Sequence, residues 1–310
     1  MSTPYEISID GHNIAALGFN QHMPGPAVFF IHGITSSLNF WVPSQTPIFN
    51  NAFRWYSLTL PGHYPATFPI GLQASDLRAD MMASVLMRSI DALAPDVPVI
   101  LVGHSTGGFS ALNIAARWPE RVAGVISISG FAHGRWTGAL AWLQWLARLG
   151  LPGSLIFQTQ FKLITSTRSI YRASFRAYAK DWEAMYAHPG LDATLDLIYP
   201  DATRLDLAAM RMYFEAMPDI DITSLLHKIT SPTLVIAGDA DPIVPHSQAR
   251  VIAREIQNAQ LEILPGVGHL PMSERGNEYN RLVSEFVKRC QEKTANPTVE
   301  ATTEMQAIAV

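Results

Sequence analysis

Cysteine is almost absent from this chain of 310 residues, since Cys290 is the only one. A single thiol cannot form an internal disulfide and has no second thiol with which to hold a metal ion. The fold is therefore not expected to depend on an oxidising compartment. The first residues, Met1 to Glu6, also lack the basic region and the apolar segment of a secretion signal. Both absences favour a cytoplasmic location.

Charge of either sign is scarce as well, because charged residues make up 15% of the chain and the formal net charge is -4. The 22 basic residues are spread along the sequence and form no cluster that would attract nucleic acid. The expected partner is a small-molecule substrate, and nothing in this pattern specifies an oligomeric state. Hydrophobic residues, at 48%, are abundant enough for one large core.

The chain also lacks an uninterrupted apolar run of transmembrane length. Its longest apolar stretch, residues 136–157, is interrupted by Gln144, Arg148, Gly150, Pro152 and Gly153. A membrane-spanning helix must satisfy all its backbone hydrogen bonds internally, so these interruptions favour a helix followed by a turn over a membrane span.

Several short apolar runs predict the strands of a sheet. Residues 5–9 and 14–17, joined by Asp10 and Gly11, have the pattern of an opening β-hairpin. Later runs are nearly all apolar, which is typical of parallel strands that are buried on both faces. These runs are residues 27–31, 55–60, 97–102, 122–128 and 233–237. Helical segments such as 76–93 and 107–117 alternate with them, which predicts an α/β fold with a mostly parallel central sheet.

The alternation stops at residues 131–226, where only helical periodicity is found, so we expect an all-helical insertion that caps the core. Residues 1–130 and 227–290 are expected to form the core domain, and residues 291–310 a flexible tail. Within the insertion, one predicted helix carries an apolar stripe of Tyr171, Phe175, Tyr178 and Trp182. Its opposite face carries Arg168, Arg172, Arg176 and Lys180, which we expect to be solvated.

Residues 103–107, Gly-His-Ser-Thr-Gly, have the Gly-x-Ser-x-Gly pattern of a nucleophile elbow. The pattern is informative only between a buried strand and a helix, and residues 97–102 and 107–117 supply both. Such a turn holds its serine in a strained backbone conformation and exposes the hydroxyl at the end of the strand. Ser105 is therefore predicted to be the nucleophile of a catalytic site.

A serine hydroxyl needs a base that a carboxylate orients, and both residue types follow downstream. His269 lies in a glycine-containing loop after the last strand-like run. Asp241 and Asp239 both follow residues 233–237, and Asp241 is the preferred acid. Asp239 remains an alternative acid. If it is not the acid, we expect it to cap a turn.

The negative oxygen that forms during acyl transfer needs backbone N–H donors. The residue after the nucleophile, Thr106, supplies one, and Ile34, which follows His32 and Gly33 after a buried strand, is expected to supply the other. His32 itself is predicted to be structural and to satisfy backbone groups of its loop. This mechanism needs no metal and no organic cofactor.

Together these motifs resemble the α/β-hydrolase superfamily over nearly the whole chain. The resemblance rests on His32-Gly33, the elbow, Asp241-Pro242, Gly268-His269 and the Leu60-Pro61-Gly62-His63 segment. In that last segment Tyr64 replaces a glycine that is frequent in the family. The resemblance implies a helical cap and places the acid at Asp241. A serine at the elbow separates the chain from the related dehalogenases and epoxide hydrolases, which use aspartate.

The resemblance implies a serine hydrolase that cleaves an ester-type bond, as a carboxylesterase or lactonase does. The aromatic residues of the insertion suggest a small, largely apolar substrate, with Trp41, Trp142 and Trp145 as candidate pocket residues. A cofactor-free C–C bond hydrolase or a perhydrolase of the same fold is an alternative. A ligand receptor with weak hydrolase activity is another.

Overall fold

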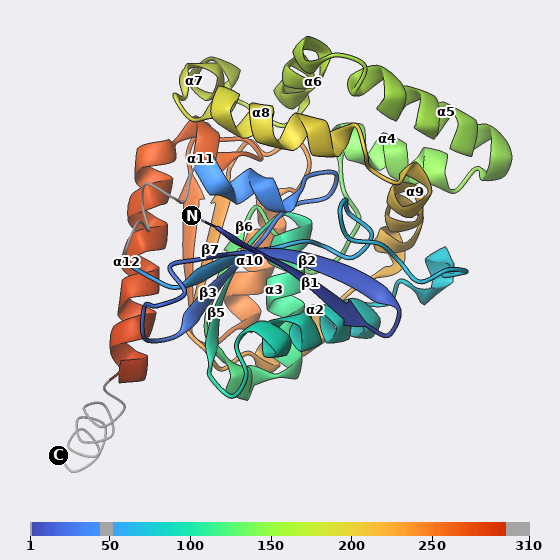
Figure 1. The fold of residues 1–310 in the computed structure, drawn as a ribbon. Helices are drawn as coiled ribbons and strands as arrows, with labels where there is room; N and C mark the ends of the chain where they lie inside the picture. Colours follow the sequence, from blue (N-terminus) through green and yellow to red (C-terminus); the bar gives the residue numbers. More distant parts are fainter. Residues whose placement is uncertain (1, 44–51, 296–310) are drawn as a thin grey trace.

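A computed structural model describes residues 2–43 and 52–295, and its core is one sheet in the order β1-β2-β4-β3-β5-β6-β7-β8 (Figure 1). The strands are β1 (Thr3–Ile9), β2 (His12–Phe19), β3 (Ala27–Ile31), β4 (Trp55–Leu58), β5 (Val99–His104), β6 (Val122–Ile128), β7 (Thr233–Gly238) and β8 (Ala259–Leu264). Strands β1 and β2 form the predicted hairpin, and β2 is antiparallel to β4. All other pairings are parallel, which confirms the predicted α/β fold.

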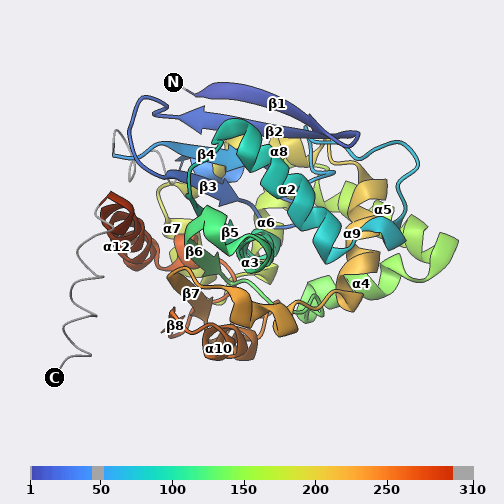
Figure 2. The same cartoon turned by 90° about the horizontal axis from the view of Figure 1, so that it is seen from below.

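Helices cover both faces of this sheet (Figure 2). The helices α2 (Ala79–Leu93), α3 (Thr106–Arg117) and α10 (His246–Glu255) lie on one face, and α12 (Gly276–Ala295) lies on the other. Alternate residues of each strand enter opposite layers, so Phe29 packs with the α2–α3 layer and Phe30 with the α12 layer. Burial on both faces explains why the sequences of the inner strands are nearly all apolar.

Helix α12 is longer than the sequence predicts. The expected flexible tail begins at residue 291, but the helix continues to Ala295. Cys290 is 2% exposed and packs close to Gly124 of β6, so the buried face of the helix reaches almost to its end. The remainder of the predicted tail, residues 296–310, lies outside the described residues.

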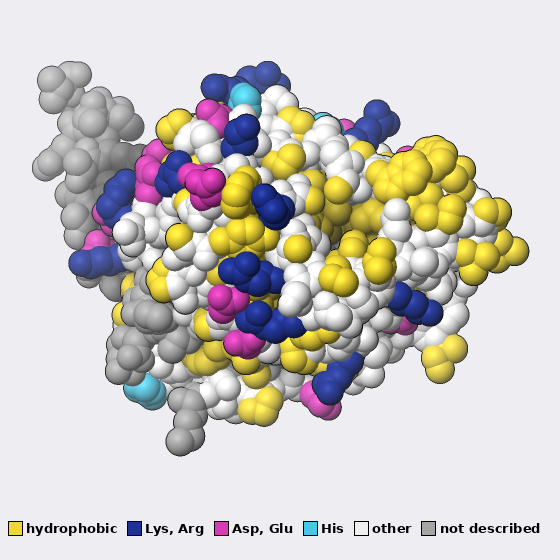
Figure 3. Space-filling view, turned by 90° about the horizontal axis from the view of Figure 1, so that it is seen from above, with side chains coloured by type: hydrophobic (Ala, Val, Ile, Leu, Met, Phe, Trp, Pro, Cys, Tyr) yellow, Lys and Arg dark blue, Asp and Glu magenta, His cyan; other side chains and the backbone are white. Residues whose placement is uncertain are grey.

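The helical insertion, residues 131–226, enters after β6 and returns to β7 (Figure 1). Its helices are α4 (Gly138–Ala147), α5 (Gly150–Ile164), α6 (Arg168–Ser174), α7 (Trp182–Ala187), α8 (Leu191–Ala202) and α9 (Leu207–Ala216). Apolar side chains gather on its surface at the α4–α5 end (Figure 3). No helix in the described part of the chain combines the length and the apolarity needed to cross a membrane.

The predicted helix through Tyr171 and Trp182 is interrupted. Helix α6 ends at Ser174, and the next α-helix starts only at Trp182. In between, the Tyr178 carbonyl accepts a hydrogen bond from the backbone N–H of His269 at 2.8 Å. Tertiary hydrogen bonds therefore replace helical ones in this segment, an effect that local periodicity does not report.

The basic face of that segment is also not simply solvated. Arg168 and Arg172 both pair with Asp192 of α8, at 3.1 Å in each case. The guanidinium of Arg176 lies 4.1 Å from the ring centroid of Trp182. These cations hold neighbouring parts of the insertion together.

Candidate active site

Ser105 occupies the junction between β5 and α3, at the carboxyl end of the parallel strands. Its backbone has φ 54° and ψ -116°, a conformation that a residue with a side chain rarely adopts and that the surrounding structure must enforce. The chain turns so tightly here that a Cβ atom on Gly107 would lie 2.1 Å from the Ile31 carbonyl oxygen. The predicted elbow is therefore present.

The structure pairs His269 with Asp241. The Nδ1–H of His269 donates to Asp241 Oδ2 at 2.7 Å, and both side chains are almost fully buried. The other carboxylate oxygen of Asp241 accepts the backbone N–H groups of Ile243 at 2.8 Å and Val244 at 2.9 Å. Asp239 instead accepts the Gly266 N–H at 2.8 Å, which gives it a role in the turn. Of the two candidate acids, Asp241 is thus the one whose carboxylate is hydrogen-bonded to His269.

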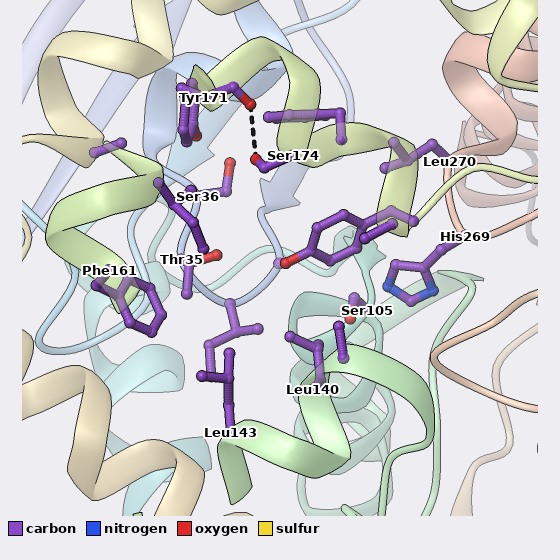
Figure 4. Close-up of a pocket in the computed structure, with 18 of the residues that line it drawn as sticks. Thr35, Ser36, Ser105, Leu140, Leu143, Phe161, Tyr171, Ser174, His269 and Leu270 are labelled. Atoms are coloured by element: carbon purple, nitrogen blue, oxygen red, sulfur yellow. Dashed lines mark hydrogen bonds between the residues drawn. The ribbon is translucent and has the colours of Figure 1, made fainter. Parts of the chain in front are cut away.

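One cavity of about 210 Å³ brings Ser105 and His269 together, since both line it. In Figure 4 the imidazole of His269 lies beside Ser105 at one side of the cavity. Because Nδ1 is bonded to Asp241, Nε2 is the ring nitrogen left for the serine hydroxyl. A serine hydroxyl, an imidazole and a carboxylate are therefore arranged in series.

Two backbone N–H groups are available next to the serine. Thr106 is the first residue of α3, so its N–H has no acceptor within the helix. The loop after β3 touches the elbow, since a Cβ on Gly33 would lie 3.3 Å from Ser105 Cβ. Ile34 follows in this loop and lines the cavity, and its N–H bonds to no other described residue. The structure thus brings both predicted oxyanion donors to the site.

Two buried histidines hold the loop that carries Ile34. His32 donates from Nδ1 to the Gly33 carbonyl at 2.8 Å and accepts the Leu60 N–H at Nε2. His63 accepts the Thr35 N–H at 3.2 Å. Burial lowers the pKa of His32 to about 4 and holds that of His63 well below the usual value, so both are neutral. His32 therefore has the structural role that the sequence predicts.

Two further residues that the sequence does not reveal hold the His269 loop. His104 donates from Nε2 to the His269 carbonyl at 2.9 Å, and burial lowers its pKa to about 3. The carboxylate of Glu274 is 3% exposed and accepts four backbone N–H groups. These donors are Gly268 at 2.9 Å, Leu270 at 3.1 Å, Lys180 at 2.9 Å and Asp181 at 2.8 Å. Glu274 therefore ties the loop on both sides of His269 to the helical insertion.

The cavity walls are mostly apolar and come from both the core and the insertion. The insertion contributes Leu140, Leu143, Phe161, Ile164, Tyr171, Phe175 and Tyr178, among others. Burial raises the pKa of Tyr178 to about 12, so its phenol is uncharged at neutral pH. Among the described lining residues there is no Lys, Arg, Asp or Glu.

The three tryptophans predicted as pocket residues do not line this cavity. Trp41 is fully buried in the core, where its ring lies 5.4 Å from that of Phe30. Trp142 and Trp145 point outward, with 47% and 52% of their surface exposed, and stack on each other at 4.7 Å. The α4 residues that do line the cavity include Leu140 and Leu143, which lie on the other face of the helix. A helix that is apolar on both faces gives no sequence signal for which face points inward.

Within residues 2–43 and 52–295, no group of three or more His, Cys, Asp and Glu side chains is placed to hold a metal ion.

Comparison with known proteins finds hydrolases and esterases among the proteins that this chain resembles. The chain is 26% identical over 271 residues to a pimeloyl-acyl-carrier-protein methyl ester esterase of Neisseria meningitidis, with 84% of this chain and 93% of that protein covered. It is 25% identical over 275 residues to a 2-hydroxy-6-oxononadienedioate/2-hydroxy-6-oxononatrienedioate hydrolase of Pseudomonas putida, covering 84% and 87%. An enol-lactonase from Burkholderia xenovorans LB400 has a similar fold, with a TM-score of 0.73, 18% identity, and 92% and 100% of the two chains covered.

A family model described as the alpha/beta hydrolase family matches residues 28–282, most of the chain. The matched region contains the sheet from β3 to β8, the elbow serine, the aspartate and the histidine. The chain therefore belongs to the alpha/beta hydrolase family.

Proposed function

We propose that this protein is a serine hydrolase that cleaves an ester-type bond through an acyl-enzyme on Ser105. The observation that carries the proposal is the buried 2.7 Å hydrogen bond between His269 and Asp241. His269 also lines the cavity that contains Ser105. The curated relatives support hydrolysis as the reaction class, because both are named as hydrolases or esterases. We further propose that the helical insertion acts as a cap over this site.

The proposed mechanism follows from the arrangement of the groups. Nε2 of His269 removes the Ser105 hydroxyl proton as Oγ attacks the substrate carbonyl, and Asp241 stabilises the imidazolium that forms. The N–H groups of Ile34 and Thr106 bind the negative oxygen of the tetrahedral intermediate. The imidazolium then protonates the leaving alcohol as the carbonyl re-forms. Water, deprotonated by His269, releases the acid and regenerates the serine.

The walls of the cavity favour an uncharged, largely apolar substrate. A charged group inside would be desolvated without a partner, because no charged side chain lines the cavity in the described part of the chain. Apolar side chains such as Leu140, Leu143 and Phe161 instead favour an aliphatic or aromatic acyl group. Butyrate, octanoate and benzoate esters should therefore react faster than acetate.

The proposal is tested with a panel of p-nitrophenyl esters and lactones and with a fluorophosphonate label. Wild-type protein should hydrolyse esters and take up one label. Ser105→Ala should lose the label and, by the usual effect of removing a nucleophile, roughly 10⁴-fold or more of the turnover. Labelling or turnover that persists in this variant would contradict the mechanism.

A matched pair of variants tests the choice of acid. In Asp241→Asn the amide oxygen is held by the N–H groups of Ile243 and Val244, so an NH2 donor faces the histidine in place of the acceptor, and turnover should fall by about 10³- to 10⁴-fold. Asp239→Asn changes only a turn and should retain most activity. Equal losses in the two variants would count against Asp241 as the orienting acid.

The same panel separates the alternative functions. The Pseudomonas putida relative is named for a dicarboxylate substrate, so a vinylogous diketo acid is included. The cavity described here offers no cation for such carboxylates, and we expect no turnover of this compound. Turnover of the diketo acid without ester hydrolysis would favour C–C bond cleavage. Tight ligand binding with no turnover would favour a receptor.

A further inference from the structure

Helices α4 and α5 present an exposed apolar surface, which we call the outer α4–α5 face. It consists of Trp142, Trp145, Leu149, Leu151, Leu155, Ile156 and Leu163. The exposed fractions of these side chains range from 43% for Leu149 to 83% for Leu151. Figure 3 shows apolar surface gathered at this end of the insertion. Single exposed apolar residues are ordinary, but a contiguous patch of this kind marks an interaction site.

Packing within the chain does not account for this face. Leu151, Leu155 and Leu163 recur at multiples of four residues, so they form a stripe along one side of α5. The opposite side of α5 is already filled by Phe157 and Phe161, which are buried at 0% and 6% exposure. A helix that carries large apolar side chains on two opposite sides normally has packing partners on both sides. The outer side of α5 lacks one among the described residues.

The charges around the face indicate the nature of the partner. Residues 138–164, which form α4, α5 and the turn between them, contain no Asp or Glu and two basic residues, Arg148 and Lys162. Arg148 is paired with Asp219, outside this stretch. Lys162 lies on α5 next to Leu163 and forms no ion pair with any described residue. Among the charged residues of this segment, Lys162 is therefore the one without an ion partner among the described residues, and its charge is positive.

The unpaired Lys162 favours an anionic partner over a second copy of this chain. A twofold contact between two outer α4–α5 faces would place each Lys162 against a face that has no Asp or Glu to pair with it. An anionic lipid surface offers apolar chains for the leucines and negative headgroups for the lysine. Tryptophan prefers the boundary between the two, which suits the stacked pair of Trp142 and Trp145.

We propose that the outer α4–α5 face docks on the surface of an anionic lipid bilayer. The leucine stripe lies among the acyl chains near the headgroups, and the two helices lie in the plane of the interface without crossing it. The inner sides of the same helices line the cavity through Leu143 and Phe161. A docked molecule therefore holds its candidate active site next to the lipid surface.

The test is co-sedimentation of the full chain with vesicles of phosphatidylcholine alone and of phosphatidylcholine mixed equally with phosphatidylglycerol. Wild-type protein should bind the mixed vesicles, and binding should weaken as salt is added. The triple variant Leu151→Ser, Leu155→Ser, Leu163→Ser should bind at least ~10-fold more weakly, since it removes three large apolar side chains from the contact. No turnover is measured, so the result is independent of the proposed ester hydrolysis.

Two further variants make the test specific. Ile70→Ser removes an equally exposed apolar side chain from a loop beside the β1–β2 hairpin and should bind like wild type. Lys162→Glu should weaken binding to the mixed vesicles only. Wild-type protein that binds neither vesicle, or a triple variant that binds like wild type, would overturn the proposal. So would self-association of the wild type that the triple variant abolishes, with no vesicle binding, because a second copy would then cover the face.

Discussion

Four backbone N–H groups converge on the carboxylate of Glu274, and two of them flank the candidate base at Gly268 and Leu270. A carboxylate can accept this many hydrogen bonds because it has two oxygens and no donor. A buried carboxylate with such partners defines a backbone conformation strictly. The position of His269 therefore depends on a residue that does not line the cavity.

Replacement of this residue should affect catalysis through the position of the histidine. Glu274→Gln turns one acceptor oxygen into an amide donor, which faces N–H groups that also donate. We expect kcat to fall by about 10- to 100-fold with a smaller change in KM, because a displaced base mainly affects the chemical step. Glu278→Gln, an exposed neighbour in α12, is the control in the same ester assay. A Glu274→Gln enzyme with unchanged kcat would show that the carboxylate does not position His269.

Individual site residues differ in how far the sequence predicts them. Ser105 and His269 lie in motifs whose spacing reflects backbone constraints, and the structure brings them together as expected. The choice of Asp241 over Asp239 rests in the sequence on family resemblance, and in the structure on a 2.7 Å hydrogen bond. Glu274 follows His269 by only five residues but resembles any surface glutamate in sequence. Its burial results from chain segments that meet only after folding.

The junction of β5 with α3 is the element on which the whole site is built. Gly107→Ala should lower the free energy of unfolding by about 3 kcal/mol, because the new Cβ would lie 2.1 Å from a backbone oxygen of β3, which cannot easily move. Gly190→Ala is a suitable control, since the nearest atoms there belong to the movable side chain of His188. Urea unfolding of both variants measures the difference. Similar midpoints would show that the elbow accommodates a methyl group.

Strands were easier to predict than the helices of the insertion. Except for the edge strand β8, the parallel strands are buried on both faces, so their apolar runs are visible without knowledge of their neighbours. The segment from Tyr171 to Trp182 has helical periodicity, yet its centre is held by hydrogen bonds to the His269 loop and to Glu274. Tertiary contacts of this kind override local preference. Such exceptions are expected next to a functional site.

The stability of the whole molecule should depend on pH through three buried histidines. His32 and His104 have pKa values of about 4 and about 3, and His63 is also well below the usual 6.5, in each case mainly because of burial. In the unfolded chain these rings take up protons near pH 6.5, so below that pH the unfolded state binds more protons than the native state. The contribution of these neutral, buried rings to the free energy of unfolding is therefore complete above about pH 6.5 and is lost as the pH falls toward 4.

Urea unfolding at about pH 7.5 and about pH 5 measures this effect. Below about pH 6.5, each histidine should lower the free energy of unfolding by on the order of 1 kcal/mol for each unit by which the pH falls. His104→Gln retains a donor for the His269 carbonyl but has no ring to protonate. The slope of the free energy of unfolding against pH should therefore decrease by the contribution of about one proton. His227→Gln, at an exposed position, should leave it unchanged. A variant of His104 with the wild-type slope would show that this ring is not kept neutral by folding.

The hydrogen bonds from Lys180 and Asp181 to Glu274, and from His269 to Tyr178, also bear on how this enzyme family diversifies. These partners are backbone groups, so an insertion taken from a relative would preserve the bonds only if it placed a carbonyl and two N–H groups at the same positions. A graft that misplaced them should lose activity even if it folded. Helices α4 and α5 carry none of these bonds. They are the portion that can be transplanted to change substrate range while the reaction machinery is left intact.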